Sequence, residues 1–168
     1  MNAKDLIQMY NREKTSTERS NFNDIYETCA EFCNPKADDI QSKKTAGERT
    51  DSQRVTDIGI KARRMFTAGM MSHMFPQGQN WIRVVTTDRE LLSNDNVVRA
   101  LSSVSKKFIN AIENSNFYEE MGQCIDHCGY IGTTTLYCES DKKNFINWRS
   151  HYINQFYFCE NYQGVVDT

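Results

Sequence analysis

The first clear pattern of apolar positions lies near the start of the chain. The apolar residues there repeat every three or four positions: Phe22, Ile25, Tyr26, Cys29, Phe32 and Cys33. This spacing predicts an amphipathic helix, and Pro35 ends it because the residue before a proline disfavours the α region. Residues 36–49 are polar and show no period, which predicts a mobile loop.

A longer helix is predicted from about Ser52 to Phe75, where Thr50 and Gln53 have the spacing of a capping box. Val55, Ile58, Ala62 and Met65 form one stripe in its first half. In its second half the apolar residues fall all round the helix at about 100° per residue: Met65, Phe66, Ala68, Met70, Met71, Met74 and Phe75. A helix that is apolar on every side is expected to be buried on every side, either in its own core or against another chain.

The end of this helix predicts a rigid corner. Pro76 and Gly78 stop the helix, and residues 81–85, Trp-Ile-Arg-Val-Val, are rich in β-formers and predict a short strand. We expect Trp81 to fold back against the methionine-rich helix end, on Met70, Met74 or Phe75, and so to anchor the corner.

Two further helices are predicted after the corner. Ser93, Asn94 and Asp95 supply caps for the first, which ends near Asn114 and has one apolar face: Val97, Leu101, Val104, Phe108 and Ile112. Asn116 with Glu119 has the spacing to cap the second, which closes at Gly129 or Gly132. Its expected buried positions are Phe117, Met121, Cys124, Ile125 and Cys128.

The last part of the chain is typical of β-structure. Residues 133–140 predict a strand, residues 140–144 a hairpin turn, and residues 145–160 one or two more strands. Four helices interleaved with short strands predict an α+β fold: amphipathic helices packed with a small, mostly antiparallel sheet weighted to the C-terminal part. At 168 residues we expect a single domain or part of one, residues 1–168.

Composition and charge mainly exclude certain classes of protein. The net charge of −2 and the 25% of charged residues give no global attraction to nucleic acid or membranes. The N-terminus lacks the apolar run of a signal peptide, and no stretch approaches the ~20 apolar residues that span a bilayer. We therefore expect a cytosolic protein whose six cysteines are free thiols.

The spacing of the cysteines raises two functional hypotheses, a zinc site and a thiol enzyme. The candidates are Cys29, Cys33, Cys124, His127 and Cys128. Three-residue gaps on a helix are typical of core positions, whereas structural zinc loops carry two-residue gaps. Adjacent His127 and Cys128 point in different directions, and nothing nearby supplies an oxyanion hole. The sequence therefore predicts no metal, no cofactor and no enzymatic activity.

A small basic cluster, Lys61, Arg63 and Arg64, is a candidate for phosphate contact. Such a cluster is more typical of the solvated face of an amphipathic helix. A monomeric nucleic-acid-binding module stays open as an alternative, beside the zinc or thiol domain.

The order of the motifs resembles the portal, or head-to-tail connector, proteins of short-tailed bacteriophages. The resemblance runs through residues 24–35, residues 51–84, residues 108–139 and residues 152–168, and so covers nearly the whole chain. Its most characteristic features are the helix that ends in Phe-Pro before a tryptophan that opens a strand, and the Asn-Ser-Asn-Phe junction followed by a glycine and a Leu-Tyr strand.

The resemblance implies a structural ring, commonly of twelve subunits, at one vertex of the capsid, through which double-stranded DNA is packaged and ejected. It implies the major capsid and scaffold proteins, terminase and tail adaptor proteins as partners, with no membrane and no small-molecule substrate. It places the protein in the virion, and in the host cytoplasm during assembly. This chain would be the N-terminal, wing-side region. Its expected packing residues are Met70, Met74, Phe75, Pro76, Trp81, Asn116, Phe117, Gly132, Leu136 and Tyr137.

Overall fold

The computed structural model describes residues 2–34, 40, 56–141, 145–158, 163 and 165–166. Its helices and strands follow the order α1 (Ala3–Lys14), α2 (Thr17–Cys33), α3 (Ile58–Met74), α4 (Arg89–Leu92), α5 (Asp95–Glu113), α6 (Phe117–Ile131), β1 (Thr135–Asp141) and β2 (Phe145–His151). Six helices with a two-stranded antiparallel sheet near the end of the chain confirm the α+β prediction for this described part.

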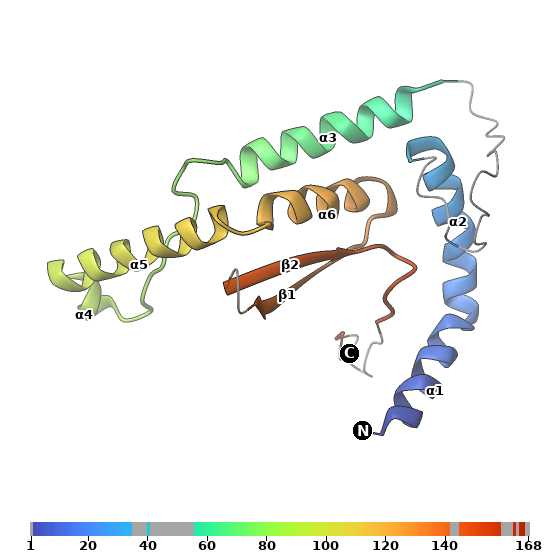
Figure 1. Ribbon diagram of the computed structural model, residues 1–168, viewed down its shortest axis with the longest axis horizontal. Helices are drawn as coiled ribbons and strands as arrows, with labels where there is room; N and C mark the ends of the chain where they lie inside the picture. Colours follow the sequence, from blue (N-terminus) through green and yellow to red (C-terminus); the bar gives the residue numbers. More distant parts are fainter. Residues whose placement is uncertain are drawn as a thin grey trace.

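The helices form layers over the hairpin. In Figure 1, α3 runs along α6 in the opposite direction, and α6 lies between α3 and the two strands. Helix α5 continues nearly the same line as α6 and projects beyond the hairpin with α4 folded against it, while α1 and α2 lie at the opposite end. The molecule is therefore elongated, with helix surfaces that face away from the central layers.

The two strands form one hairpin. They pair antiparallel from Thr135 opposite His151 to Asp141 opposite Phe145. Among the described residues a single strand, β2, therefore follows the turn, where the sequence left one or two open. The strand predicted at residues 81–85 is wrong: the segment lacks strand pairing, and the backbone N–H of Val84 donates to the Ser105 hydroxyl of α5 at 2.9 Å.

Helix boundaries follow local capping chemistry in several places. The Asn94 side chain accepts from the backbone N–H of Asn96, so the predicted start of α5 is confirmed, and its end at Glu113 agrees with the prediction. Helix α6 closes at Gly132, whose φ of 86° is left-handed, the conformation that glycine adopts most easily. Helices α1 and α4 were not predicted from the sequence. Helix α1 has a capping box at Asn2, whose backbone N–H donates to Asp5 at 3.0 Å.

A small core joins α2, α6 and the segment after β2. Its fully packed members are Ala30, Tyr130, Ile131 and Ile153. The Asn34 amide that ends α2 donates to the Tyr130 hydroxyl at 3.1 Å. Arg19 donates to the backbone oxygen of Ile153, and its guanidinium lies over the Tyr157 ring. Contacts between residues far apart in the sequence thus hold this end together.

The prediction for the long helix needs the largest correction. Helix α3 begins at Ile58, and the capping-box positions Thr50 and Gln53 lie outside the described residues. None of its residues is buried, and Met65 is 75% exposed. In the described chain α3 contacts α6 and α2, while Ile58 and Met65 stay exposed, so the core of this chain alone does not bury the helix on every side. Burial against another chain stays a prediction.

Other burial predictions are corrected by the actual rotation of the helices. In α5, Val104 and Phe108 are exposed, and the buried positions are Ser105, Ile109 and Ile112. In α6, Cys128 is exposed and Met121 is half-buried, whereas Phe117, Cys124 and Ile125 are buried as expected. The loop expected at residues 36–49 lies outside the described residues, apart from Ile40.

Candidate functional site

The corner after α3 is built by backbone geometry that its residues favour. Phe75 caps α3, and Pro76 follows it and offers no N–H to continue the helix. Gly78 has a φ of 73°, in the left-handed region, and its N–H donates to the Glu113 carboxylate at the end of α5 at 3.1 Å. The turn is therefore fastened to a helix 35 residues further along the chain.

Aromatic rings fill this corner, and we call Phe75, Trp81, Phe117 and Trp148 the aromatic corner. Phe117 is 4% exposed and lies at its centre. Its ring centroid is 5.7 Å from that of Phe75, 5.9 Å from that of Trp81 and 5.2 Å from that of Trp148. Phe75 and Trp81 meet edge to face at 5.1 Å. These are favourable ring separations, so four segments of the chain converge on one cluster.

The polar atom of the Trp81 ring also has a partner. The indole N–H donates to the Tyr118 hydroxyl at 3.2 Å. The ring contacts of Trp81 come from Phe75 and Phe117. Among the methionines expected nearby, Met70 is half-buried and Met74 is half exposed at the end of α3.

Asn116 stands at the N-cap position of α6 as predicted, but its side chain makes no capping hydrogen bond and binds the hairpin instead, which corrects the capping-box prediction. Its side-chain amide donates to the Trp148 carbonyl oxygen at 2.8 Å and accepts from the Trp148 N–H at 2.9 Å. Glu120 accepts from the Ser150 N–H at 2.7 Å. These side chains satisfy backbone groups of β2 as a neighbouring strand would, and they fasten α6 to that strand.

The α3–α6 contact is close at one glycine. A Cβ placed on Gly129 would come within 2.8 Å of the Phe66 ring, so a side chain at this position would have to displace that ring. Gly132 then ends α6, and the strand that follows carries Leu136, which is half-buried, and Tyr137, which is 54% exposed. Tyr137 therefore lies on the surface of the hairpin.

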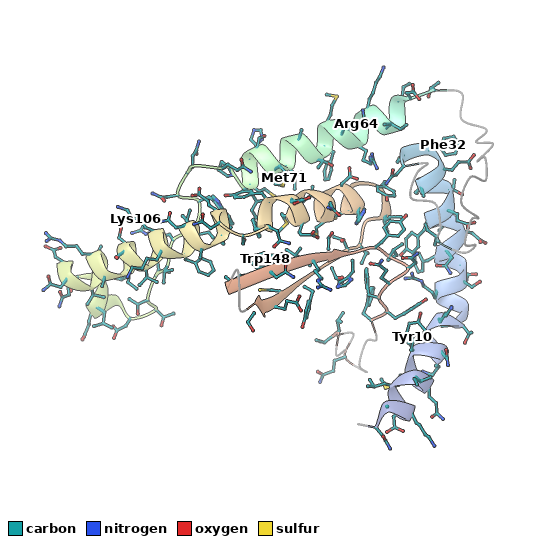
Figure 2. All side chains as sticks on the ribbon, viewed as in Figure 1. Tyr10, Phe32, Arg64, Met71, Lys106 and Trp148 are labelled. Carbon is teal, nitrogen blue, oxygen red and sulfur yellow. The ribbon has the colours of Figure 1, made fainter. Side chains whose placement is uncertain are left out.

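The three basic residues of α3 separate into different environments. Arg63 faces α6, where its guanidinium lies 3.2 Å from the Asp126 carboxylate and over the Tyr130 ring. The Thr67 hydroxyl is 3.2 Å from the other Asp126 oxygen. Lys61 and Arg64 are exposed, and Figure 2 labels Arg64 on α3. The structure therefore does not bring the three cations to one surface, and Arg63 joins α3 to α6.

The cysteine and histidine candidates lack the geometry of a reactive centre. Burial raises the pKa of the Cys33 thiol, with a further contribution from Cys29, and burial also raises the pKa of the Cys124 thiol. A raised pKa keeps a thiol protonated at neutral pH, which disfavours both nucleophilic attack and metal binding. The exposed Cys128 lies 3.8 Å from the Gly132 carbonyl oxygen as a weak donor.

Within the residues that the structure describes, no three His, Cys, Asp or Glu side chains come together in a way that suits a metal ion. His127 is partly enclosed, and this burial lowers its pKa; its ring lies 5.0 Å from that of Tyr152.

A hollow of about 340 Å³ lies between residues 80–85 and α5. Its titratable lining residues are Arg83 and Lys106, which do not form an acid–base pair.

Several residues that join the segments were missed at the sequence level. Glu113, Glu120 and Trp148 contact residues more than 25 positions away, and nothing in their local spacing distinguishes them from surface polar or strand residues. The described helices include none that is long and apolar enough to cross a bilayer. The contacts described above are structural joints between segments that lie far apart in the sequence.

Comparison with known proteins agrees with a structural role. The model of the family described as bacteriophage head to tail connecting protein matches residues 4–168. This chain belongs to that family, whose description names a connector and no reaction.

Two phage proteins show the same relationship. The chain is 24% identical to the portal protein of Salmonella phage epsilon15 over 166 residues, which is 98% of this chain and 29% of that protein. It is 23% identical to a probable portal protein of Bordetella phage BPP-1 over 153 residues, 90% of this chain and 28% of that protein. The chain therefore spans less than a third of the length of either relative.

Proposed function

We propose that this chain forms the wing-side part of a portal ring at one vertex of a phage capsid. The observation that carries this proposal is the match to the head-to-tail connector family over residues 4–168. In the ring, the channel conducts double-stranded DNA during packaging and ejection, and the assembly is the attachment point of the tail. The partners are further copies of the chain, the major capsid and scaffold proteins, terminase and tail adaptor proteins.

The joints of the described structure suit a subunit that transmits load. The aromatic corner holds the end of α3, the start of α6 and strand β2 together. The turn at Gly78 is fastened to α5, and Asn116 with Glu120 fastens α6 to β2. A force on one element is therefore passed to its neighbours through packed rings and hydrogen bonds, since close-packed interiors transmit strain.

The complete gene product that carries this chain tests the proposal directly. We expect it to form a closed symmetric ring in solution, visible by electron microscopy and as one mass by native mass spectrometry. A nonsense mutation in the gene should give capsids without packaged DNA. A product that stays monomeric at high concentration, or a mutant that still fills its capsids, would contradict the proposal.

The nucleic-acid module is tested separately. With a net charge of −2 and Arg63 engaged by Asp126, the chain has few free cations on α3 for phosphate. We expect the 168-residue chain to bind duplex DNA weakly at physiological salt and with a shallow salt dependence, because binding strength follows the number of phosphates neutralised. Tight binding with a steep salt slope in a fluorescence titration would favour the module instead.

A further inference from the structure

The hollow of about 340 Å³ between residues 80–85 and α5 is open to water, and we call it the α5 hollow. Its apolar lining comes from residues 80–85, α4 and α5: Ile82, Val84, Val85, Leu92, Val98 and Leu101. Val85, Leu92 and Val98 are 61%, 41% and 37% exposed, so the described chain leaves aliphatic surface here in contact with water. The volume lies at the lower end of the range of pockets that hold small ligand groups.

The buried polar side chain of the lining already has its partners. Ser105 is 8% exposed, and its hydroxyl donates to the Leu101 carbonyl oxygen at 2.8 Å and accepts from the Val84 N–H at 2.9 Å. An apolar group that enters the hollow therefore leaves this hydroxyl paired, whereas an unpaired buried hydroxyl would cost free energy. The lining thus favours an aliphatic side chain as its occupant.

The wall formed by residues 80–85 is held in place without an occupant. Trp81 packs in the aromatic corner on Phe75 and Phe117, directly before this wall continues. The Gly78 N–H is bound to Glu113 of α5, and the contact between Val84 and Ser105 fastens the wall itself to α5. A pocket that is already formed has a smaller ordering cost when it binds.

Two cations stand on the two walls of the hollow. Arg83 belongs to residues 80–85, and Lys106 belongs to α5, where Figure 2 labels it. Both are exposed, and within the described residues neither forms an ion pair. No carboxylate is among the residues that line the hollow. The α5 hollow is therefore an aliphatic site with a positive charge on each wall.

We propose that the α5 hollow binds an extended segment of another protein in which an aliphatic side chain is flanked by carboxylates. The aliphatic side chain leaves water in the hollow, and the carboxylates pair with Arg83 and Lys106. Because the two cations lie on different walls, a ligand with one carboxylate, such as a fatty acid, pairs with only one of them. This inference goes beyond the proposed ring and does not depend on it.

Calorimetric titration of the complete gene product tests the site with three blocked peptides of equal length. The first alternates glutamate and leucine, the second has glutamine for glutamate, and the third has serine for leucine. We expect the first to bind at least about fivefold more tightly than either of the others at low salt, since it alone brings both the aliphatic group and the charges. Added salt should reduce its advantage over the glutamine peptide, because exposed charges are screened.

Charge reversal locates the site. Arg83→Glu with Lys106→Glu should weaken binding of the glutamate–leucine peptide about tenfold, and this variant should bind a lysine–leucine peptide instead. Ser102→Leu, at an exposed lining position, should weaken binding of both peptides because it fills the hollow. The matched control is Arg99→Glu with Lys107→Glu, the same charge change on exposed residues of α5 outside the lining. It should change the affinity by less than about twofold, and circular dichroism should show that every variant is folded.

Four results would overturn the proposal. Equal binding of the glutamate and glutamine peptides would show that the cations take no part. An equal loss in the control variant would show a response to net charge alone. Decanoate that binds more tightly than the glutamate–leucine peptide, with the same dependence on Arg83 and Lys106, would assign the hollow to a fatty acid. Absence of binding by the first peptide would leave the site without its ligand class.

Assembly separates this site from the proposed function. If Arg83→Glu with Lys106→Glu prevents a ring that the wild type forms, the hollow lies at a contact between copies, and the external partner is wrong. A wild type that forms rings and binds none of the peptides overturns the site alone. A wild type that stays monomeric and binds the glutamate–leucine peptide contradicts the ring and supports the site.

Discussion

The two sides of α3 share a composition but have different surroundings. On the inner side, Phe66 packs against Gly129, Arg63 pairs with Asp126, and the helix ends at the aromatic corner. On the outer side, Ile58 and Met65 are largely exposed. The methionine-rich pattern therefore describes two surfaces, of which one is covered within the described chain and the other is not.

This difference separates the side of α3 that stabilises the fold from the side that faces away from the described chain. The inner side gains from a ring contact and an ion pair whose partners, Phe117 and Asp126, come from α6, far along the sequence. The outer side carries small and flexible apolar residues that leave room for a further helix. Substitutions should therefore affect the stability of the fold more on the inner side than on the outer side.

The largest expected effect is at the centre of the aromatic corner. Phe117→Ala removes a 4% exposed ring with several aromatic neighbours and should lower the free energy of unfolding by about 3–5 kcal/mol. Trp81→Ala should cost less, because this ring is only half-buried. Met65→Ala, on the outer side, should cost less than about 0.5 kcal/mol. Urea unfolding followed by circular dichroism measures all three, and equal costs for Phe117 and Met65 would break the distinction.

The second-largest expected loss of stability is at the ion pair between Arg63 and Asp126. Asp126→Asn leaves the Arg63 guanidinium, whose side chain is 12% exposed, without its counter-charge. We expect a loss of about 2 kcal/mol, below the value for a fully buried pair because Asp126 is partly solvated. Lys61→Gln on the outer side is the control and should change stability by less than about 0.5 kcal/mol. A neutral Asp126→Asn would show that Arg63 does not join the helices.

Cysteines on α6 provide a third comparison of inside and outside. Cys124→Ala should cost about 1–2 kcal/mol as a packing loss, whereas Cys128→Ala, at an exposed position, should cost less than about 0.5 kcal/mol. Elemental analysis of the purified protein should find no stoichiometric metal. One zinc per chain, with unfolding on chelation, would instead establish the zinc interpretation.

Two glycines of the same region give a matched pair. A Cβ at Gly69 or at Gly78 would meet no atom within 4 Å, and only Gly78 has a positive φ. Gly69→Ala should stabilise the 168-residue chain by about 0.5–1 kcal/mol, because alanine favours helix. Gly78→Ala should destabilise it by about 1 kcal/mol or more through backbone strain.

The smallest effect is a dependence on pH at His127. Burial lowers the pKa of this imidazole in the folded state, so the unfolded chain binds the proton more readily. The contribution of His127 to stability is therefore complete above the ordinary histidine pKa of about 6.5 and is lost as the pH falls from there through the folded pKa. His127→Gln should flatten stability in this window, and an unchanged pH profile would contradict the assignment.

Local patterns predicted the elements that depend on neighbouring residues. The helices ending at Cys33 and Glu113, the stop at Phe75 and Pro76, and the cap at Gly132 follow from periodicity, from proline and from left-handed glycine. The strand predicted at residues 81–85 failed because β-propensity mainly measures packing beside another strand, and here the segment lies along α5. Asn116 failed as a cap because Trp148 offered its amide a pair of backbone partners.

By itself, the sequence determined helices α2, α3, α5 and α6, the hairpin and the turn at Gly78, since each depends on interactions within a few residues. It also carried the order of motifs by which the chain resembles its family. Only the tertiary structure decided which side of α3 meets α6, that Arg63 pairs with Asp126, and that Phe117 gathers Phe75, Trp81 and Trp148. The reason is physical: an apolar pattern states that a surface gains by leaving water, while the partner that covers it is chosen by packing between distant segments.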